Sequence, residues 1–189
     1  VTGGDDAVLE KASHYSQKFV DVIKMIQESE GPVFIYSKWI PHGIVGIYTI
    51  LDALGWEFYD RKSDLSSNVS RYSIWSPGGL ESKGGFSSEK DVELYINNMR
   101  QTFNSPENRD GKLIKVLISN IVEGISLKGV NQVHVCEPWW NMSKMEQIIA
   151  RAIRLCSHSH LPPERQYVDV YYHCSVLDSY PSYNPAIQD

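Results

Sequence analysis

Short apolar runs that alternate with stretches of helical spacing constrain the fold of this chain more than any other feature. The clearest runs are GPVFIYS (31–37), KLIKVLIS (112–119) and NQVHVCE (131–137), each of a length that suits one buried strand. Between residues 16 and 29, apolar residues recur at the spacing of one helix face. Strands that alternate with helices form parallel sheets. We therefore predict an α/β fold with a central, mostly parallel sheet flanked by helices.

Weaker patterns complete the predicted order of elements. Helical spacing appears at 42–54, where Gly55 ends the pattern, and again at 91–103. Residues 56–59 and 165–174 are expected as further strands. Each of these segments fits between or beside the three apolar runs without breaking the alternation.

The composition indicates one domain with less regular segments around it. We expect the domain to span residues 16–174, with 1–15 as a linker or edge segment and 175–189 as a tail. Residues 60–90 are rich in Ser and Gly and keep no sustained period, so we expect a long surface excursion there. A chain of 189 residues, 42% of them hydrophobic, is large enough for one well-buried core.

Charge and cysteine content limit the classes of function. The net charge is −5, so nucleic-acid binding would have to come from a local basic patch. No apolar run is long enough to span a bilayer, and the first residues lack the pattern of a secretory signal. Three cysteines without framework spacing fit a reducing compartment and are expected as buried thiols.

Polar and aromatic residues follow three of the predicted strands. They are Ser37-Lys38-Trp39, Ser119-Asn120 and the segment 137–141 (EPWWN). In a parallel sheet the carboxyl ends of the strands gather functional groups at one edge. We therefore expect these three segments to form a single rim.

The stretch EQIIARAIRLCSH (146–158) places three polar residues at helical spacing. A helix starting near Ser143, with Glu146 completing a capping box, would carry Gln147, Arg151 and Arg154 on one face. Two guanidiniums so close repel each other, and a phosphate between them would relieve that repulsion. We expect this helix to join the rim of strand ends and to bind a phosphate.

Three segments in order resemble motifs of superfamily 2 helicases and translocases. FIYSKW (34–39) resembles motif IV, LISNIVEGISLKGVNQVHVCEPWWN (117–141) resembles motif V with its following strand, and QIIARAIR (147–154) resembles motif VI. The match is to the second, C-terminal RecA-like domain, and it is similar to the Snf2-like helicases of poxviruses and African swine fever virus. It covers roughly residues 16–174, with 60–90 unmatched.

The resemblance implies an ATP-driven motor in which ATP lies between two RecA-like domains. Arg154 would be the arginine finger and Arg151 a second phosphate contact, while Gln147 and Gly124 would shape the ATP cleft. The nucleic-acid-binding residues carried over from motifs IV and V are Ser37, Lys38, Ser119 and Asn120. They would contact backbone phosphates of DNA or RNA, contacts that carry no sequence information.

Cofactors and partners follow from the same resemblance. ATP and Mg²⁺ would be bound mainly by an N-terminal RecA-like domain of the same protein, because nothing in this chain matches Gly-x-x-x-x-Gly-Lys-Ser/Thr or an acidic Mg²⁺-binding pair after a strand. We therefore expect the chain alone not to hydrolyse ATP. Other viral replication or transcription proteins are a further expected class of partner, and the expected location is the host cytoplasm or the virion.

Other interpretations remain open on the sequence. The chain could be a catalytically inert helicase-like scaffold in a viral transcription or packaging complex, or another nucleotide-binding α/β protein such as a glycosyltransferase domain. Ser126 stands where the family usually has Asp or Asn, which puts the register of motif V in doubt. Adjacent Trp139 and Trp140 could stack on bases, although adjacent tryptophans more often pack against a core.

A zinc site is the remaining alternative that the sequence raises. The cysteines and histidines concerned are Cys156, His158, His160, His173 and Cys174. Their spacing matches no known zinc finger, so no metal site is predicted.

Overall fold

The computed structural model describes residues 3–60, 62–121 and 124–175. The helices are α1 (Gly3–Ser13), α2 (Gln17–Glu28), α3 (Val45–Ala53), α4 (Pro77–Lys83), α5 (Glu89–Phe103) and α6 (Met142–Ile149). The strands are β1 (Val33–Tyr36), β2 (Glu57–Phe58), β3 (Arg71–Trp75), β4 (Val116–Ser119), β5 (Gln132–Val135) and β6 (Asp169–Tyr172). A π-helical segment, η1 (Ile40–Ile44), leads into α3, and η2 (Pro106–Asn108) and η3 (Pro163–Arg165) are 3-10 turns.

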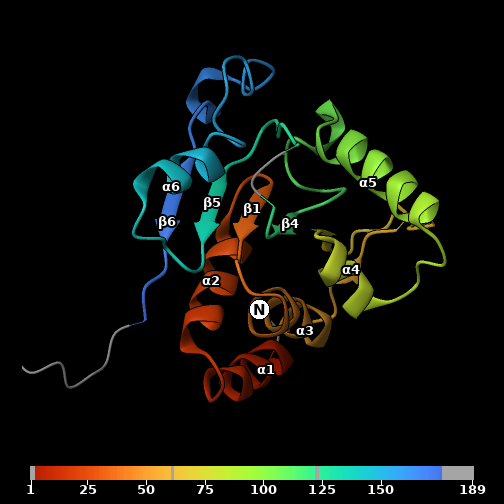
Figure 1. Cartoon of the computed structure of the whole chain (residues 1–189), viewed down its shortest axis with the longest axis vertical. Coiled ribbons are helices and arrows are strands. Elements are labelled where there is room, and N and C mark those ends of the chain that lie inside the picture. Colours follow the sequence, from red (N-terminus) through yellow and green to blue (C-terminus); the bar gives the residue numbers. More distant parts are fainter. Residues whose placement is uncertain (1–2, 61, 122–123, 176–189) are drawn as a thin grey trace, which may run out of the picture.

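The described strands form one parallel sheet in the order β2-β3-β4-β1-β5-β6. Figure 1 shows β4, β1, β5 and β6 side by side. Strand β1 lies between β4 and β5, and its last residue, Tyr36, aligns with Ser119 and Val135. All the strands point the same way, so their carboxyl ends share one edge. The predicted α/β fold with a central parallel sheet is confirmed.

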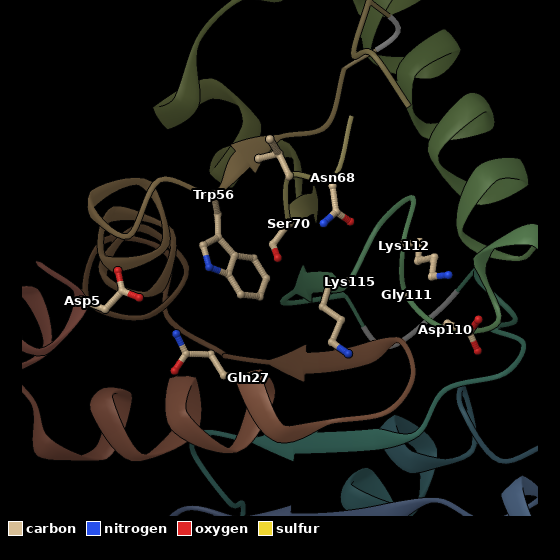
Figure 2. Close-up of a pocket in the computed structure, with 10 residues that line it drawn as sticks. Asp5, Gln27, Trp56, Asn68, Ser70, Asp110, Gly111, Lys112 and Lys115 are labelled. Atoms are coloured by element: carbon tan, nitrogen blue, oxygen red, sulfur yellow. The ribbon is translucent and has the colours of Figure 1, made fainter. Parts of the chain in front are cut away.

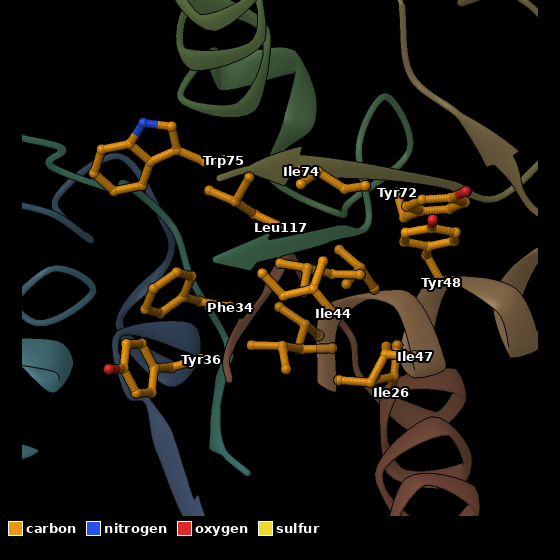
Figure 3. Close-up of a cluster of buried hydrophobic side chains, with 14 of the residues drawn as sticks. Ile26, Phe34, Tyr36, Ile44, Ile47, Tyr48, Tyr72, Ile74, Trp75 and Leu117 are labelled. Carbon is orange, nitrogen blue, oxygen red and sulfur yellow. The ribbon is translucent and has the colours of Figure 1, made fainter. Parts of the chain in front are cut away.

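The core forms because the central strands are buried on both faces and the helices bring apolar sides to them. All four residues of β1 and all four of β4 are buried. Ser16 caps α2 by accepting a hydrogen bond from the amide of Phe19, and the apolar side of α2 is buried. Figure 3 shows Ile26 of α2 beside Ile44 and Ile47 of the η1–α3 segment.

The expected surface excursion at 60–90 is wrong in its central part. Residues 71–75 form β3, which is completely buried and pairs with both β2 and β4. The sequence RYSIW was not predicted as a strand because Arg71 and Ser73 interrupt its apolar pattern. Both side chains have partners inside the protein: one terminal nitrogen of Arg71 donates to the carbonyl oxygens of Asp64 and Ser67, and Ser73 bonds to the Tyr95 hydroxyl at 2.6 Å. The Nε of Arg71 lies 3.2 Å from the Glu57 carboxylate, and its second terminal nitrogen is buried without a hydrogen-bond partner in the described residues.

The hydroxyl of Tyr95 completes the edge of β3. Strand β2 is two residues long and pairs with Arg71 and Tyr72, so it leaves the next part of β3 uncovered. There the Tyr95 hydroxyl accepts a hydrogen bond from the Ile74 amide and donates one to the Ile74 carbonyl, both at 3.1 Å. One side chain of α5 thereby substitutes for a missing strand.

The two ends of the chain were predicted to be a linker (1–15) and a tail (175–189). Residues 3–13, expected as a linker, form α1, which packs on α2 and α3 and contributes Leu9 and Ala12 to the core. Of the expected tail, residues 176–189 lie outside the described residues. Cys136 is buried as expected, whereas Cys156 and Cys174 are exposed. None of the described helices is long and apolar enough to cross a membrane.

Candidate functional site

The structure brings together the three segments that follow β1, β4 and β5. The amide of Ser37 donates to the Ser119 carbonyl at 3.0 Å, and the amide of Cys136 donates to the Tyr36 carbonyl at 2.9 Å. The three segments lie together because the last residues of β1, β4 and β5 are aligned neighbours in the sheet. Strand β3 ends at the same edge with Trp75, which the sequence did not indicate.

The two serines at this edge turn their hydroxyls inward. Ser119 donates to the Trp75 carbonyl at 2.7 Å and accepts from the Ile121 amide at 2.9 Å, while Ser37 donates to the Trp39 carbonyl at 3.3 Å. Both side chains are fully buried. Gly43 must be glycine because a Cβ there would lie 1.9 Å from the Ser37 Oγ. The serines therefore hold the loops in place.

Lys38 and Asn120 are partly exposed, unlike the two serines. The Oδ1 atom of Asn120 is buried without a hydrogen-bond partner in the described structure, so the amide nitrogen is the part of this side chain that could donate to a phosphate. The backbone amide of Lys38 donates to the Glu137 carboxylate at 3.0 Å, which fixes the loop and leaves the ammonium group on its flexible stem. These two residues are the members of the predicted set that can reach outward.

Lysines and tryptophans gather around the ends of β1 and β5. The Lys38 ammonium lies 3.8 Å from the ring centroid of Trp139 and 4.9 Å from that of Trp39, and the Lys144 ammonium lies 4.9 Å from Trp139. We call Lys38, Trp39, Trp139, Trp140 and Lys144 the strand-end patch. The sequence placed these residues at one rim but did not show that the lysines lie over the rings.

Electrostatics at this edge are set by one carboxylate and its partners. Glu137 forms an ion pair with Lys18 at 3.5 Å, and the Lys18 ammonium also donates to the Cys136 carbonyl at 2.8 Å. Burial, and secondarily the Glu137 charge, raises the pKa of the Tyr36 hydroxyl and of the Cys136 thiol. The thiol of Cys136 therefore stays protonated at neutral pH and is no nucleophile.

The two predicted phosphate-binding arginines lie beyond the end of α6, and not on its face. Asn141, rather than Ser143, caps the helix by accepting from the Ser143 amide at 3.0 Å, and the helix ends at Ile149. Past that point, the Arg154 amide donates to the Ser157 hydroxyl at 3.2 Å, which diverts the chain from helical geometry. The predicted helix with Gln147, Arg151 and Arg154 on one face is therefore wrong after its second turn.

The arginines also lie away from the rim that we expected them to join. Helix α6 starts beside the strand-end patch and extends beside β5 (Figure 1). A helix that follows a strand in a parallel sheet returns antiparallel to it, and eight residues carry the chain about 12 Å. The Arg151 carbonyl then accepts from the Leu127 amide at 2.9 Å, in the segment that leads into β5. The structure thus has two separate clusters.

The second cluster joins the segments that resemble motifs V and VI. The Arg154 guanidinium donates to the Ser126 hydroxyl, and its Nε donates to the Ala150 carbonyl at 3.1 Å. Arg151 is half-buried, and its Nε atom has no hydrogen-bond partner in the part of the chain that the structure describes. Gln147 is exposed on α6, four residues before Arg151. Ser126, the residue at which motif V departs from the expected pattern, is therefore the partner of Arg154.

Two further residues fix the segment around Ser126. Gly124 has φ of +87°, a conformation that favours glycine, and the Trp75 ring lies 3.6 Å from where a Cβ would be. Asn104, at the end of α5, donates to the Ser126 carbonyl and accepts from the Lys128 amide, both at 2.8 Å. No sequence pattern indicates Asn104, because its partners lie more than twenty residues away.

Two of the residues weighed for zinc have other partners. His158 bonds to the Ser157 hydroxyl and the Val130 carbonyl, and His173 bonds to His134 at 2.8 Å. Within the described ranges, no group of three or more His, Cys, Asp or Glu side chains could hold a metal ion.

A polar pocket of about 390 Å³ lies at the opposite edge of the sheet (Figure 2). It is lined in part by Gln27, Trp56, Asp110 and Lys112. Lys115, just before β4, donates to the Ser29 carbonyl, and burial lowers the pKa of its ammonium group to about 8. None of the predicted site residues lines this pocket.

Comparison with known proteins places these clusters in a family context. Residues 93–156, from α5 to just past Arg154, match the family of helicase conserved C-terminal domains. A protein of Acanthamoeba polyphaga mimivirus, named as a proposed ATP-dependent RNA helicase, is 34% identical over 174 residues, which cover 91% of this chain and 28% of that protein.

Two further viral relatives agree. The termination factor NPH-I homolog of African swine fever virus (isolate Warthog/Namibia/Wart80/1980) is 29% identical, with 86% of this chain and 26% of that protein covered. Nucleoside triphosphatase I of Heliothis armigera entomopoxvirus is 30% identical, with 93% and 23% covered. The chain thus spans about a quarter of the length of these relatives.

A solved structure agrees in fold. The C-terminal part of the Fun30 ATPase domain superposes with a TM-score of 0.50 at 17% identity, covering 82% of this chain and 40% of that chain. The predicted RecA-like fold is confirmed. The resemblance to the C-terminal domain of viral superfamily 2 helicases is confirmed by the family match and the viral relatives.

Proposed function

We propose that this chain, a helicase C-terminal domain similar to those of large DNA viruses, supplies Arg151 and Arg154 to ATP bound between two RecA-like domains of a longer protein. That protein would be an ATP-dependent helicase or translocase. It would act in the host cytoplasm or the virion, as the likeness to viral proteins suggests. The observation that carries the proposal is the half-buried guanidinium of Arg151, whose Nε has no hydrogen-bond partner among the described residues.

The charge balance of the arginine cluster supports an anionic ligand. Among the described residues, neither Arg151 nor Arg154 forms an ion pair with a carboxylate. A half-buried cation without a counter-ion loses hydration that nothing in the described structure replaces. A phosphate accepts the forked hydrogen bonds of guanidinium groups better than any other common anion.

Arg154 would have to move before it could reach a nucleotide. At rest its guanidinium is held by the Ser126 hydroxyl and the Ala150 carbonyl, two neutral acceptors. Hydrogen bonds to neutral acceptors are weaker than those to a phosphate. Arrival of a phosphate from the partner domain would therefore draw Arg154 away from Ser126.

ATP and Mg²⁺ would be held mainly by the N-terminal RecA-like domain, where Mg²⁺ neutralises the phosphate oxygens. This chain would contribute positive charge as the terminal phosphoryl group leaves. Gln147, exposed one helical turn before Arg151, would contact the facing domain. Gly124 would let the chain turn between the cleft and the nucleic-acid track.

The track would lie at the strand-end edge. Lys38 and Asn120 would contact backbone phosphates of DNA or RNA, while Ser37 and Ser119 hold the two loops that carry them. Such contacts are independent of sequence, as a protein that moves along any sequence requires. Separation of the two clusters at opposite ends of α6 would let one domain couple nucleotide and nucleic acid.

The test is ATP hydrolysis by the full-length protein, with and without DNA or RNA. Arg154→Ala should lower the rate constant of turnover by about 10³-fold or more, the usual worth of an arginine finger. Arg100→Ala is the matched control, because Arg100 is an exposed arginine on α5 whose side chain contacts Asn97. Unchanged thermal unfolding would show that Arg154→Ala still folds. Turnover at the wild-type rate in that variant would overturn the proposal.

An inert scaffold in a viral transcription complex is the second candidate. It draws support from the African swine fever virus relative, whose name describes a termination factor. A full-length protein that binds viral transcription proteins and hydrolyses no ATP with any nucleic acid would favour this scaffold.

A further inference from the structure

The strand-end patch contains two largely exposed tryptophans. Trp140 is 86% exposed and Trp39 is 54% exposed, values far above those usual for tryptophan. Both residues are in loops fixed by hydrogen bonds, Trp39 beside the Ser37 hydroxyl and Trp140 directly before the Asn141 cap. Their rings are thus presented on a rigid part of the fold.

The neighbouring Trp139 has a different role. Its ring is partly buried against the core, and its amide contacts the Met145 sulfur at 3.3 Å. Lys38 and Lys144 lie over this ring, so Trp139 holds two ammonium groups at the ends of β1 and β5. The patch therefore combines exposed aromatic rings with positive charge.

The local charge is positive although the chain is acidic overall. The carboxylate of Glu137, which follows β5 at this edge, is already engaged by the Lys18 ammonium and the Lys38 amide. Lys38 and Lys144 form no ion pair among the described residues. Two lysines and two exposed rings match a strand whose phosphates and bases are both accessible.

We propose that the strand-end patch binds single-stranded nucleic acid, with bases stacked on Trp140 and Trp39 and adjacent phosphates on Lys38 and Lys144. This inference rests on the proposed nucleic-acid track and adds the contact with bases. A duplex keeps its base faces covered by stacking, so it could offer this patch phosphates alone. A partner protein is the competing occupant, and the test below separates the two.

The test measures binding of the 189-residue chain to a fluorescent oligothymidylate, to an oligonucleotide of equal length made of abasic sites, and to a duplex. Stacking predicts that oligothymidylate binds more tightly than the abasic strand or the duplex. Trp140→Ala should lower the affinity for oligothymidylate roughly 5- to 150-fold, the range found for loss of one stacked base. Its affinity for the abasic strand should not change, and Trp140→Phe should keep most of the binding.

Three controls make the result specific. Tyr167→Ala removes another exposed aromatic side chain, which lies before β6 at the opposite edge of the sheet, and should change nothing. Lys38→Ala should weaken binding to both single strands, because it removes a phosphate contact. Trp39→Ala, a second removal of an exposed ring, should act in the same direction as Trp140→Ala.

Two outcomes would overturn the inference, and they differ in what they imply for the track. If abasic and thymidylate strands bind equally and Trp140→Ala has no effect, stacking fails while the phosphate track stands. If the chain binds none of the three nucleic acids, both the stacking and the track at this edge fail, and the patch is left to a protein partner. The role of Arg154 in ATP hydrolysis is measured separately and is not affected by either outcome.

Discussion

Single hydroxyl and imidazole groups decide how tightly the sheet edge is held. We expect Tyr95→Phe to lower the free energy of unfolding by about 1–3 kcal/mol, because it leaves the Ile74 amide and carbonyl buried without a partner. Tyr59→Phe is the matched control. It removes a partly exposed hydroxyl bond to Thr102, so its cost should be smaller. Urea unfolding of both variants checks this, and equal costs would contradict the edge-completing role of Tyr95.

Acid should weaken the fold through His134. Burial, followed by the neighbouring His173, lowers the pKa of His134 from 6.5 to about 3. Below about pH 6.5 the unfolded chain takes up a proton that the folded chain refuses, so stability is complete above that pH and is lost as the pH falls towards 3. The slope is about 1.4 kcal/mol per pH unit for this group.

The measurement is urea unfolding at pH 7.5 and pH 5.0. His134 alone should account for a loss of about 2 kcal/mol over that interval, and His173, whose pKa burial also lowers, adds to it. His134→Gln should reduce the pH dependence by that amount, whatever it does to stability at pH 7.5. An unchanged difference between the two pH values would assign the effect to other groups.

At the scale of elements, the N-cap of α6 is Asn141 in the structure, whereas the sequence predicted Ser143. Asn141→Ala should cost about 1 kcal/mol of stability, because it removes the side chain that accepts from the Ser143 amide. Ser143→Ala should cost close to nothing, since serine lies inside the first turn. Chemical denaturation of the two variants distinguishes the caps, and the reverse order of costs would restore Ser143 as the N-cap.

Most strands were predictable because a strand that is buried on both faces needs a continuous run of apolar residues, as in β1 and β4. Strand β3 was not, since Arg71 and Ser73 break the run and find their partners only after the chain has folded. The end of α6 was missed for a similar reason. Residues 149–155 keep a helical apolar period, but the Arg154 amide donates to the Ser157 hydroxyl, so the helix does not continue.

Part of the candidate site was also predictable from the sequence and part was not. Lys38 and Asn120 could be placed at one edge because parallel strands end together. The pairing of Arg154 with Ser126, and the lysines over Trp139, depend on side-chain directions and loop packing that no periodicity encodes.

For the molecule as a whole, we expect the chain alone to hydrolyse no ATP. Its arginines can stabilise charge on a phosphate, but the sequence has no phosphate-cradling loop to hold one. The measurement is phosphate release by the 189-residue chain with and without oligonucleotides, beside the full-length protein. Adding a separately prepared N-terminal RecA-like domain should raise the rate. Turnover by the chain alone that Arg154→Ala abolishes would mean that the chain holds the nucleotide itself.

The central place of β1 bears on how the protein is made. Val33 is synthesised well before its neighbours in the sheet, which are Val116 and Gln132. At usual rates of synthesis this apolar strand waits roughly 4 to 20 seconds for the first of them. During that interval VFIY has unpaired backbone groups on both sides, the state that chaperones bind and that aggregation exploits. This strand is therefore exposed to aggregation before Arg151 and Arg154 have been translated.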